Sequence, residues 1–540
     1  MKAKALAVYL LILALGAGYI SLFPRVSAAT PELKAAQSLN DIRTERPKLM
    51  AFLKQMPKGG DLHSHLSGAV YAETFLRWAV EAKLCVDKDT LILSKAVETA
   101  QAKANKTQPL TPEGCEQGGI RLKQELAAND PVLYRRMIDA WSMRNWEHSG
   151  KSGHDQFFDS FEKFGEVTGR TGEMIAEVMK RAEASGVSYL ELMLSLDGGK
   201  AWDFGSNIKW NGDYELTGNY GGALDELHKN TEYKPAIENG LQYVYDAEKQ
   251  ARAILKCNES EENPGCKVTV RYICQVARGG PRAQVFAQML MAFEMADADA
   301  KRQNPRLVGI NLVQPEDGMV AMDNFPVHMQ MLNYLHSRYP AVNITLHAGE
   351  LAPGLVPPDG LKFHIHDSVE EGHAKRIGHG VDIMQEDNAP ALLREMADKG
   401  VMVEICLSSN DKILGVRGKD HPLAEYLRYG VPVALATDDE GVARSDMTLE
   451  YVKAAEEQGL SYQQLKMMAR NSLQYAFISG ERLWRNAKSS FEMVPQCSEA
   501  DLTNTSSACQ KFLDGSEKAT LQWKLEKALK SFENQEGISN

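Results

Sequence analysis

Residues 56–65 read Met-Pro-Lys-Gly-Gly-Asp-Leu-His-Ser-His. The part from Gly60 to His65 is predicted to form a short β-strand that ends in two imidazoles, His63 and His65. Side chains two residues apart on a strand point to the same face, so these two imidazoles project together. Asp61 has the same parity, and we expect it to be a hydrogen-bonding partner of one of the imidazoles.

Seven further β-rich runs follow, each bounded by turn residues: Val187–Leu194, Lys267–Val276, Leu307–Val313, Asn343–His347, Arg376–Ile383, Val401–Leu407 and Val431–Thr437. Several are nearly continuous apolar runs, as is typical of parallel strands covered by helices. Helical patterns lie between them, at Gly172–Ser185, Ala283–Ala300, Phe325–Arg338 and Ala389–Lys399. Eight strands alternating with helices predict an α/β fold, the (β/α)₈ TIM barrel. A doubly wound open sheet is the alternative, but no Gly-x-Gly-x-x-Gly motif follows the first strand to support it.

Three segments are additional to a minimal barrel, which typically needs about 250 residues. Residues 84–147 form a polar insertion after the first strand, and residues 203–242 form a second insertion after the second strand. Residues 489–540 form a C-terminal extension with a helical pattern at Lys518–Phe532. We therefore assign residues 29–488, including both insertions, to one barrel.

The amino terminus has the pattern of a signal peptide. Lys2 and Lys4 precede an apolar run at Ala5–Phe23, and small residues stand at Val26-Ser27-Ala28, before a cleavage site. We expect residues 1–28 to be removed and the protein to be exported, either to a periplasm or out of the cell. A retained membrane anchor is the alternative.

Eight cysteines fit an exported protein. Six of them bracket short polar loops of the kind that disulfides close, in the pairs Cys85 and Cys115, Cys257 and Cys266, and Cys497 and Cys509. We expect these pairs, although the count alone leaves other connectivities open. Cys274 and Cys406 lie in apolar runs and are expected to be buried thiols. Zinc knuckles are the alternative, but no Cys-x-x-Cys spacing occurs.

The composition is that of a folded globular protein. Of the 540 residues, 44% are hydrophobic and 25% are charged, which excludes wholesale disorder. Lys and Arg number 61 against 72 Asp and Glu, a formal charge of −11. This acidic balance argues against a nucleic-acid partner, which would favour a basic face.

Residues that carry chemistry recur at the ends of other predicted strands. His347 ends the fifth run, His379 lies in the sixth and Asp438 follows the eighth. In a barrel these strand ends meet at one mouth, where active sites lie. Neutral imidazoles and a carboxylate together suit a divalent cation, and Zn²⁺ is the cation we expect.

Together, four motifs resemble the adenosine deaminase family of the metal-dependent amidohydrolase superfamily: Met-Pro-Lys-Gly-Gly-Asp-Leu-His-Ser-His at 56–65, His-Ala-Gly-Glu at 347–350, Gly-His-Gly at 378–380 and Thr-Asp-Asp at 437–439. They follow the family's order along the chain. The predicted signal peptide and the cysteine-bearing insertion resemble its secreted branch, the adenosine deaminase-related growth factors.

The resemblance implies one Zn²⁺ per chain, bound by four ligands: His63, His65, His347 and Asp438. It also implies that His379 orients the attacking hydroxide and that Glu350 gives a proton to purine N1. Asp439 would bond to N7 as the protonated acid, because neutral N7 is an acceptor. One carboxyl must then ionise while another keeps its proton, so their environments must separate their pKa values.

Other substrate contacts follow the family pattern less closely. Ser67 stands where relatives have an acid that touches the ribose 5′-hydroxyl, and Gln314 stands where they have a Gly whose N–H reaches purine N3. Phe161 belongs to an aromatic stripe in Gln156–Phe164 that resembles the helix lining the substrate pocket. The same helical spacing is also typical of core packing.

The implied function is that of an exported zinc-dependent adenosine deaminase, which hydrolyses adenosine or deoxyadenosine to inosine or deoxyinosine and ammonia. One alternative is another amidohydrolase acting on adenine or a modified adenine nucleoside. A binuclear hydrolase commonly needs a carboxylated Lys, and none lies in Leu307–Glu316. A third alternative is a secreted partner-binding protein with a vestigial barrel. The expected partner is a small purine nucleoside; a homodimer, and a receptor or surface partner for residues 84–147, stay open.

Overall fold

The computed structural model describes residues 30–96, 114–115, 118–486, 491–498, 502 and 504–536. The predicted signal peptide, residues 1–28, lies outside the described residues. Within them, no helix is long and apolar enough to cross a membrane.

Eight parallel strands of the described chain form the centre of the molecule, in two sheets of four. The first sheet has the order β1-β5-β6-β7, with bounds Gly59–His65, Val187–Leu194, Thr269–Ala277 and Leu307–Val313. The second has the order β8-β9-β10-β11, with bounds Thr345–Ala348, Arg376–His379, Met402–Ile405 and Val433–Leu435. Parallel bridges join the sheets at both edges, from Ile310 to Ile344 and from Ser64 to Asp438. The predicted barrel is therefore confirmed, and the open-sheet alternative is wrong.

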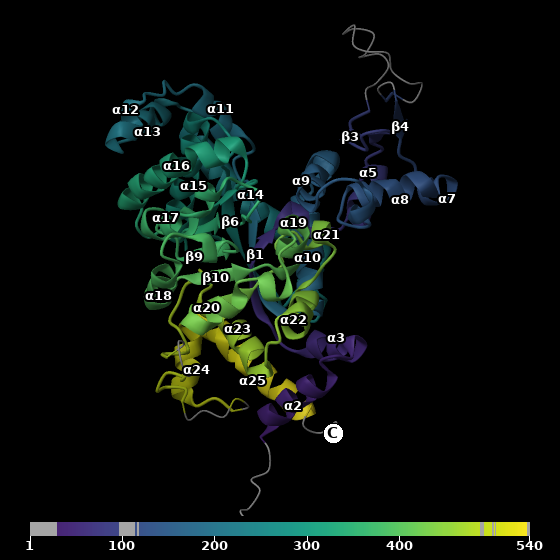
Figure 1. The fold of residues 1–540 in the computed structure, drawn as a ribbon, viewed down its shortest axis with the longest axis vertical. Helices are drawn as coiled ribbons and strands as arrows, with labels where there is room; N and C mark the ends of the chain where they lie inside the picture. Colours follow the sequence, from purple (N-terminus) through teal and green to yellow (C-terminus); the bar gives the residue numbers. More distant parts are fainter. Residues whose placement is uncertain are drawn as a thin grey trace, which may run out of the picture.

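Helices surround the strands, because the strands are apolar on their outer faces as well (Figure 1). They are α10 (Thr171–Ala184), α14 (Tyr233–Ile254), α15 (Arg282–Ala300), α16 (Met319–Arg338), α17 (His364–Glu370), α18 (Ala389–Lys399), α20 (Leu423–Tyr429), α22 (Met447–Glu456) and α23 (Tyr462–Gln474). Helix α23 packs against β1 and β11 and so covers the junction between the first and last strands. Short 3₁₀ turns lie at Trp146–His148, Gly165–Val167, Pro358–Leu361, Ile383–Gln385 and Gly418–Asp420.

The sixth strand is shorter than the sequence predicts. We expected Arg376–Ile383, but β9 ends at His379, where φ is +68°, and Gly380 follows with φ of +59°. A Cβ on Gly380 would lie 2.4 Å from the Tyr426 hydroxyl oxygen, so only glycine fits this turn. The left-handed turn ends the strand directly at a candidate site residue.

The insertion after the first strand is a small subdomain. It contains the antiparallel sheet β3-β2-β4, with bounds Leu93–Ser94, Cys85–Asp87 and Gly119–Arg121. Two helices follow, α7 (Leu126–Asn129) and α8 (Pro131–Ala140), and α8 packs against α5 (Ala72–Glu81). This insertion projects from one side of the barrel in Figure 1.

The second insertion, residues 203–242, is helical. It comprises most of α11 (Lys200–Ser206), all of α12 (Asp213–Thr217) and α13 (Gly221–Lys229), and the start of α14. Its Trp210 and Tyr220 pack with Phe286 of α15, with ring centroids 5.3–6.1 Å from the Phe286 centroid. The aromatic residues therefore fix these helices on the barrel.

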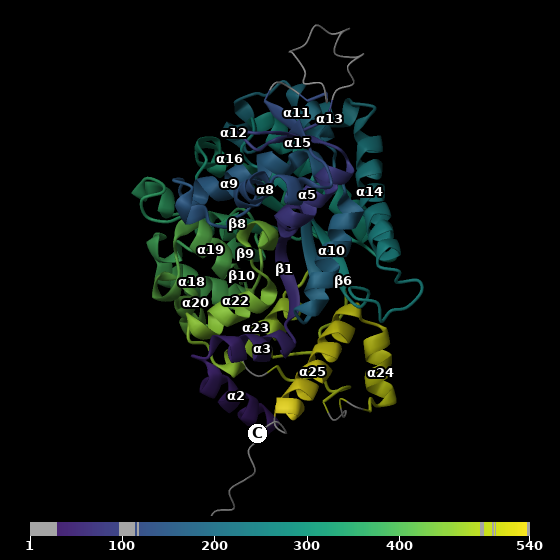
Figure 2. The same cartoon turned by 90° about the vertical axis from the view of Figure 1, so that its right-hand side faces the viewer.

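The C-terminal extension covers the end of the barrel where the strands begin. The predicted helix at Lys518–Phe532 is confirmed as α25 (Glu517–Glu536), which α24 (Ser507–Asp514) precedes. Helix α25 packs against α2 (Pro31–Ile42), and both lie at the lower end of the barrel in Figure 2. Helix α3 (Arg46–Gln55) leads from α2 into β1.

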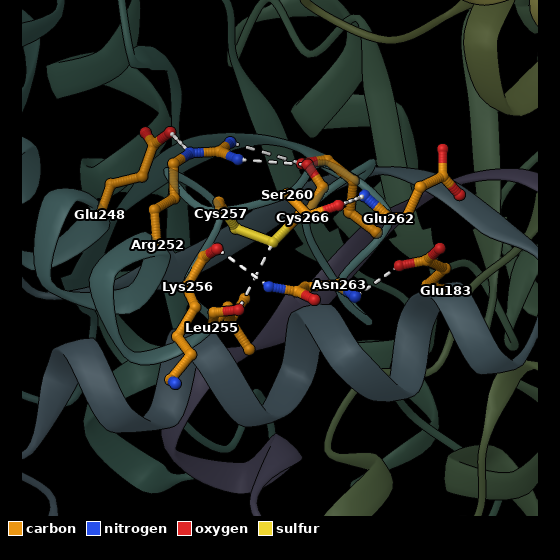
Figure 3. The surroundings of a disulfide bond; sticks show 12 residues. Glu183, Glu248, Arg252, Leu255, Lys256, Cys257, Ser260, Glu262, Asn263 and Cys266 are labelled. Atoms are coloured by element: carbon orange, nitrogen blue, oxygen red, sulfur yellow. Dashed lines mark hydrogen bonds and ion pairs between the residues drawn. A yellow bond between two sulfur atoms is a disulfide. The ribbon is translucent and has the colours of Figure 1, made fainter.

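The three expected disulfides are present among the described residues: Cys85–Cys115, Cys257–Cys266 and Cys497–Cys509. Cys274 and Cys406 are free and buried, as predicted. Figure 3 shows the second disulfide, whose loop is also held by a hydrogen bond from the Asn263 amide to the Lys256 carbonyl oxygen, 2.9 Å long. These cross-links stabilise segments outside the barrel core.

Candidate active site

Four ligand atoms converge at the mouth of the barrel where the strands end. The Nε2 atom of His347 lies 3.0 Å from Nε2 of His63 and 3.0 Å from Nε2 of His65. Asp438 Oδ1 lies 3.5 Å from His63 Nε2 and 3.3 Å from His65 Nε2. All four residues are buried. The structure thus brings together the four predicted metal ligands, which come from β1, β8 and the turn after β11.

Each of the three imidazoles is oriented by a contact of its other ring nitrogen, Nδ1. His63 Nδ1 lies 2.6 Å from Glu404 Oε2, and His347 Nδ1 lies 3.0 Å from Asn311 Oδ1. His65 Nδ1 contacts the side-chain amide of Gln275. A ring that donates through Nδ1 keeps the Nε2 lone pair for a cation, so the contacts with Glu404 and Asn311 favour metal binding at Nε2 of His63 and His347.

The carboxylate of Asp438 is held in its ionised form. Burial alone would raise its pKa, but the hydrogen bond from His63 and the charges of the surrounding imidazoles bring the pKa well below its ordinary value. Ser409 donates to Asp438 Oδ2 at 2.6 Å and fixes the other oxygen. Three imidazoles and an ionised carboxylate form a donor set that suits Zn²⁺.

Asp61 does not contact an imidazole ring, contrary to our expectation. Its Oδ2 accepts a hydrogen bond of 2.5 Å from the Thr437 hydroxyl, and its Oδ1 faces the backbone N–H of His63 at 3.3 Å. The side chain at this position points away from the ring edges and ties β1 to the segment before Asp438. Asp61 therefore supports the site through the backbone.

Glu350 lies in the turn after β8 with its carboxyl group facing the site. Its Oε1 is 3.7 Å from His379 Nε2, and its backbone N–H donates to Glu316 Oε2 at 2.8 Å. Burial raises the pKa of Glu350 well above its ordinary value, and the negative charges of Asp438 and Glu316 raise it further. The side chain can therefore act as a proton donor near neutral pH.

Asp439 is a second buried acid at the mouth. Burial raises its pKa well above the ordinary value, and the neighbouring Asp438 carboxylate adds to the effect. Its Oδ1 has no hydrogen-bond partner within the described residues. Gly68 leaves room for this group, since a Cβ there would lie 1.5 Å from Asp439 Oδ1. A buried carboxyl oxygen without a partner is available for a ligand.

A chain of hydrogen bonds sets the tautomer of His379. The Leu423 backbone N–H donates to His421 Nδ1 at 3.2 Å, and His421 Nε2 lies 3.1 Å from Asn410 Oδ1. The Asn410 amide nitrogen lies 2.9 Å from His379 Nδ1. Because the first donor is a backbone N–H, His421 must carry its proton on Nε2, and Asn410 must donate to His379. His379 thus presents Nε2–H to the site, and burial lowers its pKa to about 3, which keeps the ring neutral.

The remaining predicted contacts lie around this centre. Ser67 is half-buried in α4 (Leu66–Ala69), directly before Gly68, at the rim of the site. Gln314 is exposed with φ of +83°, and its side-chain oxygen accepts from the Gly279 N–H at 2.8 Å. Its backbone keeps a glycine-like conformation, but its side chain bonds to the turn after β6 (Thr269–Ala277).

Phe161 is partly buried in α9 (Gly153–Phe164). Its ring packs against Phe157 at 5.7 Å and Phe164 at 5.6 Å between centroids. Helix α9 lies against α19 (Leu407–Leu414) and α21 (Glu440–Ala443), which begin just beyond β10 and directly after Asp439. The stripe therefore serves as packing for a helix beside the mouth, and a direct contact of Phe161 with substrate stays a prediction.

Sequence reasoning missed the residues that orient the ligands: Glu404, Asn311, Gln275 and Ser409. A usable signal was present for two of them, because Asn311 and Glu404 interrupt otherwise apolar barrel strands. Polar residues on buried strands need hydrogen-bond partners, and histidines at neighbouring strand ends supply them.

The chain is similar in sequence to known proteins. A sequence model of the family described as "Adenosine deaminase" matches residues 245–486. An adenosine deaminase of Klebsiella pneumoniae (strain 342) is 30% identical over 251 residues, which cover 45% of this chain and 70% of that protein. One from Serratia proteamaculans (strain 568) is 34% identical over 175 residues, 31% of this chain and 49% of that protein. For several such relatives the chain matches about half of their length.

Among solved structures, "Crystal structure of arabidopsis ADAL complexed with IMP" is 19% identical and has a TM-score of 0.47. The match covers 79% of this chain and 94% of that chain. The match to the Klebsiella pneumoniae protein covers more than two thirds of that protein. The chain therefore belongs to the adenosine deaminase family of the amidohydrolase superfamily.

Proposed function

We propose that this protein is an exported, zinc-dependent adenosine deaminase. It would hydrolyse adenosine and deoxyadenosine to inosine and deoxyinosine, with release of ammonia. The observation that carries the proposal is the placement of two buried acids with raised pKa values, Glu350 and Asp439, beside a cluster of convergent ligand atoms. This arrangement offers proton donors to a heteroaromatic base next to a site for an activated water.

His63, His65, His347 and Asp438 would hold one Zn²⁺. When bound at such a site, zinc lowers the pKa of a coordinated water to about 7 and so supplies hydroxide at neutral pH. Glu404 and Asn311 keep two of the ligand rings in the orientation that this requires.

Each of the other polar side chains acts on a different atom of the purine or on the oxygen nucleophile. Glu350 donates a proton to N1, which makes C6 electrophilic, and Asp439 donates a hydrogen bond to N7. His379 directs Nε2–H toward the oxygen nucleophile and stabilises its position during attack at C6. Water adds at C6, and the exocyclic amine leaves as ammonia.

A second candidate function has the same deamination chemistry but a substrate with a different sugar or none. Ser67, at the place where the family pattern has an acid, favours a substrate whose ribose is held less tightly, such as adenine or a modified adenine nucleoside. The shared feature of both candidates is a 6-aminopurine. The three disulfides of the described chain support the proposal of export, because such cross-links persist in oxidising compartments.

The proposal is tested by ammonia release from adenosine, deoxyadenosine, adenine and AMP, with the purified protein before and after chelation. We expect the highest kcat/KM for adenosine or deoxyadenosine, loss of turnover with chelator and recovery with added zinc. Preference for adenine would establish the second candidate. Failure of the zinc-loaded protein to deaminate any of the four would contradict both.

A further inference from the structure

A cavity of about 1020 Å³ lies at the opposite end of the barrel from the candidate active site. It is lined by residues that directly precede β9 and β10, such as Lys375 and Val401, and by the segment after α23. Lys518, in the first turn of α25, forms another wall. We propose that this basal cavity binds a small oxyanion of the phosphate or sulfate class that carries at least two negative charges.

The charge of the cavity is opposite to that of the chain. Five cationic side chains line it: Lys375, Lys399, Arg482, Arg485 and Lys518. Among the described residues of its lining, Glu370 is the one acid. The whole chain, in contrast, has 72 acidic and 61 basic residues. A hollow lined by one sign of charge concentrates counter-ions, so the basal cavity attracts anions although the chain as a whole is acidic.

Two of these cations already have acidic partners. Lys399 pairs with Glu370 and, at 2.7 Å, with Glu395. Arg485 lies 3.5 Å from Glu492. Their charges are therefore largely compensated inside the protein, and they are not the cations on which the inference depends.

The other three cations have no carboxylate partner within the described part of the chain. Lys375 donates to the neutral Asn343 side chain at 2.8 Å, and Lys518 donates to the Ala476 carbonyl oxygen at 2.8 Å. Arg482 forms no hydrogen bond or ion pair with a described residue, and it is exposed to the cavity and solvent. An ammonium has three donors and a guanidinium has five, so most donors of this group are available to a ligand.

Mutual repulsion among these groups supports the same conclusion. Burial lowers the pKa of Lys518 to about 7, and the charge of Arg482 contributes to the decrease. Burial also lowers the pKa of His336, with further contributions from His373 and Lys375. The His336 and His373 rings stack in the cavity wall with centroids 4.2 Å apart. A bound anion would relieve the repulsion and restore the charged forms.

The three available cations also come from three separate parts of the chain. Lys375 lies before β9, Arg482 lies after α23, and Lys518 lies in the first turn of α25, within the C-terminal extension. A ligand with charges on more than one side can contact all three, and it would link the extension to the barrel. We therefore expect binding to stabilise the folded protein, because a ligand that prefers the folded state raises its stability.

The test measures binding of sodium phosphate, sodium sulfate and glycerol 2-phosphate to the full protein by calorimetry, against sodium chloride at equal ionic strength. We expect saturable binding of phosphate or sulfate and a higher thermal midpoint. Binding of glycerol 2-phosphate as well would identify phosphate esters as ligands, whereas its exclusion would restrict the site to inorganic anions. Absence of saturable binding beyond chloride for all three would overturn the proposal.

Variants locate the binding. Arg482→Glu should weaken oxyanion binding by at least about tenfold, since it replaces an attractive charge with a repulsive one. Lys524→Glu makes the same change in charge at an exposed position of α25 that does not line the cavity, and it should leave the affinity within about twofold. Equal binding by wild type and Arg482→Glu would overturn the proposal even if an anion binds elsewhere.

Discussion

Two groups of buried carboxyls in the barrel differ in whether the protein itself satisfies them. In the middle of the barrel, Arg376 lies 2.6 Å from Glu191 Oε2 and 2.6 Å from Glu404 Oε1, and all three are almost fully buried. At the mouth, Glu350 and Asp439 are also buried, but no described Arg or Lys pairs with them. The first group holds the barrel together, and the second is prepared for a ligand.

The difference extends to the protonation of these groups. Burial alone would raise the pKa of Glu404, but the charge of Arg376 and the hydrogen bond from His63 lower it below the ordinary value. Burial raises the pKa values of Glu350 and Asp439, and nearby carboxylates raise them further. The same residue type is thus an anion in the middle layer and an acid at the mouth, because its neighbours differ.

The largest effect should follow from removing one convergent imidazole. His347→Ala is expected to lose the bound zinc and to reduce deamination to background, since two other ligand nitrogens lie 3.0 Å from the deleted group. Metal content per chain and ammonia release measure both losses. His366→Ala is the matched control at an exposed histidine. Retention of one zinc per chain by His347→Ala would show that the ligand set is different.

Glu350→Gln should separate activity from stability. Loss of the proton donor is expected to lower kcat by about 10²- to 10⁴-fold. The free energy of unfolding should stay the same or rise, because the substitution removes a buried acid that the protein leaves without a cationic partner. Urea unfolding at equal zinc occupancy measures the second effect. A large loss of stability would mean that Glu350 has a structural role instead.

Arg376→Met should mainly reduce stability. It leaves Glu191 and Glu404 buried without their cation, which is expected to cost about 3–5 kcal/mol of unfolding free energy. Urea unfolding is the measurement, and Arg428→Met, at an exposed arginine paired with Glu425, should leave the transition unchanged. If Arg376→Met were as stable as wild type, the ion pairs of Arg376 with Glu191 and Glu404 would not stabilise the barrel.

The sequence predicted the parts of the site that depend on strand ends. Strand ends meet at one mouth whatever the loop lengths, so His63, His347 and Asp438 could be placed together from eight apolar runs. It did not predict that His379 would have φ of +68° and end its strand, because that turn depends on Gly380 fitting beneath Tyr426. Patterns of neighbouring residues do not indicate such contacts between residues that are far apart in the sequence.

The sequence also did not predict the directions of several side chains. Asp61 has the strand parity of the ligands but bonds to Thr437, and Gln314 turns its side chain to Gly279. Glu404 and Asn410 support the site through a histidine from another element. Their roles depend on which residues face each other across the barrel, and one sequence does not specify this register.

A smaller effect on activity is expected at Asn410, which donates to His379. Asn410→Asp keeps the size of the side chain but cannot donate to His379 Nδ1, so the ring should change its tautomer. We expect kcat to fall by about 10- to 100-fold with little change in KM. Steady-state kinetics and ¹⁵N imidazole chemical shifts measure the two consequences.

His421 provides the control for this relay. His421→Gln can still donate to Asn410 Oδ1 and should keep most of the activity, whereas His421→Leu should behave like Asn410→Asp. Unchanged kcat in both Asn410→Asp and His421→Leu would show that the tautomer of His379 does not depend on these residues.

The smallest effect concerns a contact beside the mouth, between His154 of α9 and the segment after β7. His154 Nε2 lies 3.0 Å from Asp317 Oδ1, and this hydrogen bond raises the pKa of His154. An unfolded histidine has a pKa of about 6.5. The stabilisation is therefore complete below that pH and is lost as the pH rises through the higher folded pKa.

We expect His154→Asn to reduce the free energy of unfolding by about 0.5 kcal/mol in acidic solution and by less in alkaline solution. Urea unfolding at about pH 5.5 and pH 8.5, on either side of the ordinary histidine pKa, measures the difference. His148→Asn, an exposed histidine close by in the chain, is the matched control. A larger loss at the higher pH would have the wrong sign and would mean that neutral His154, rather than its ion pair with Asp317, stabilises this part of the mouth.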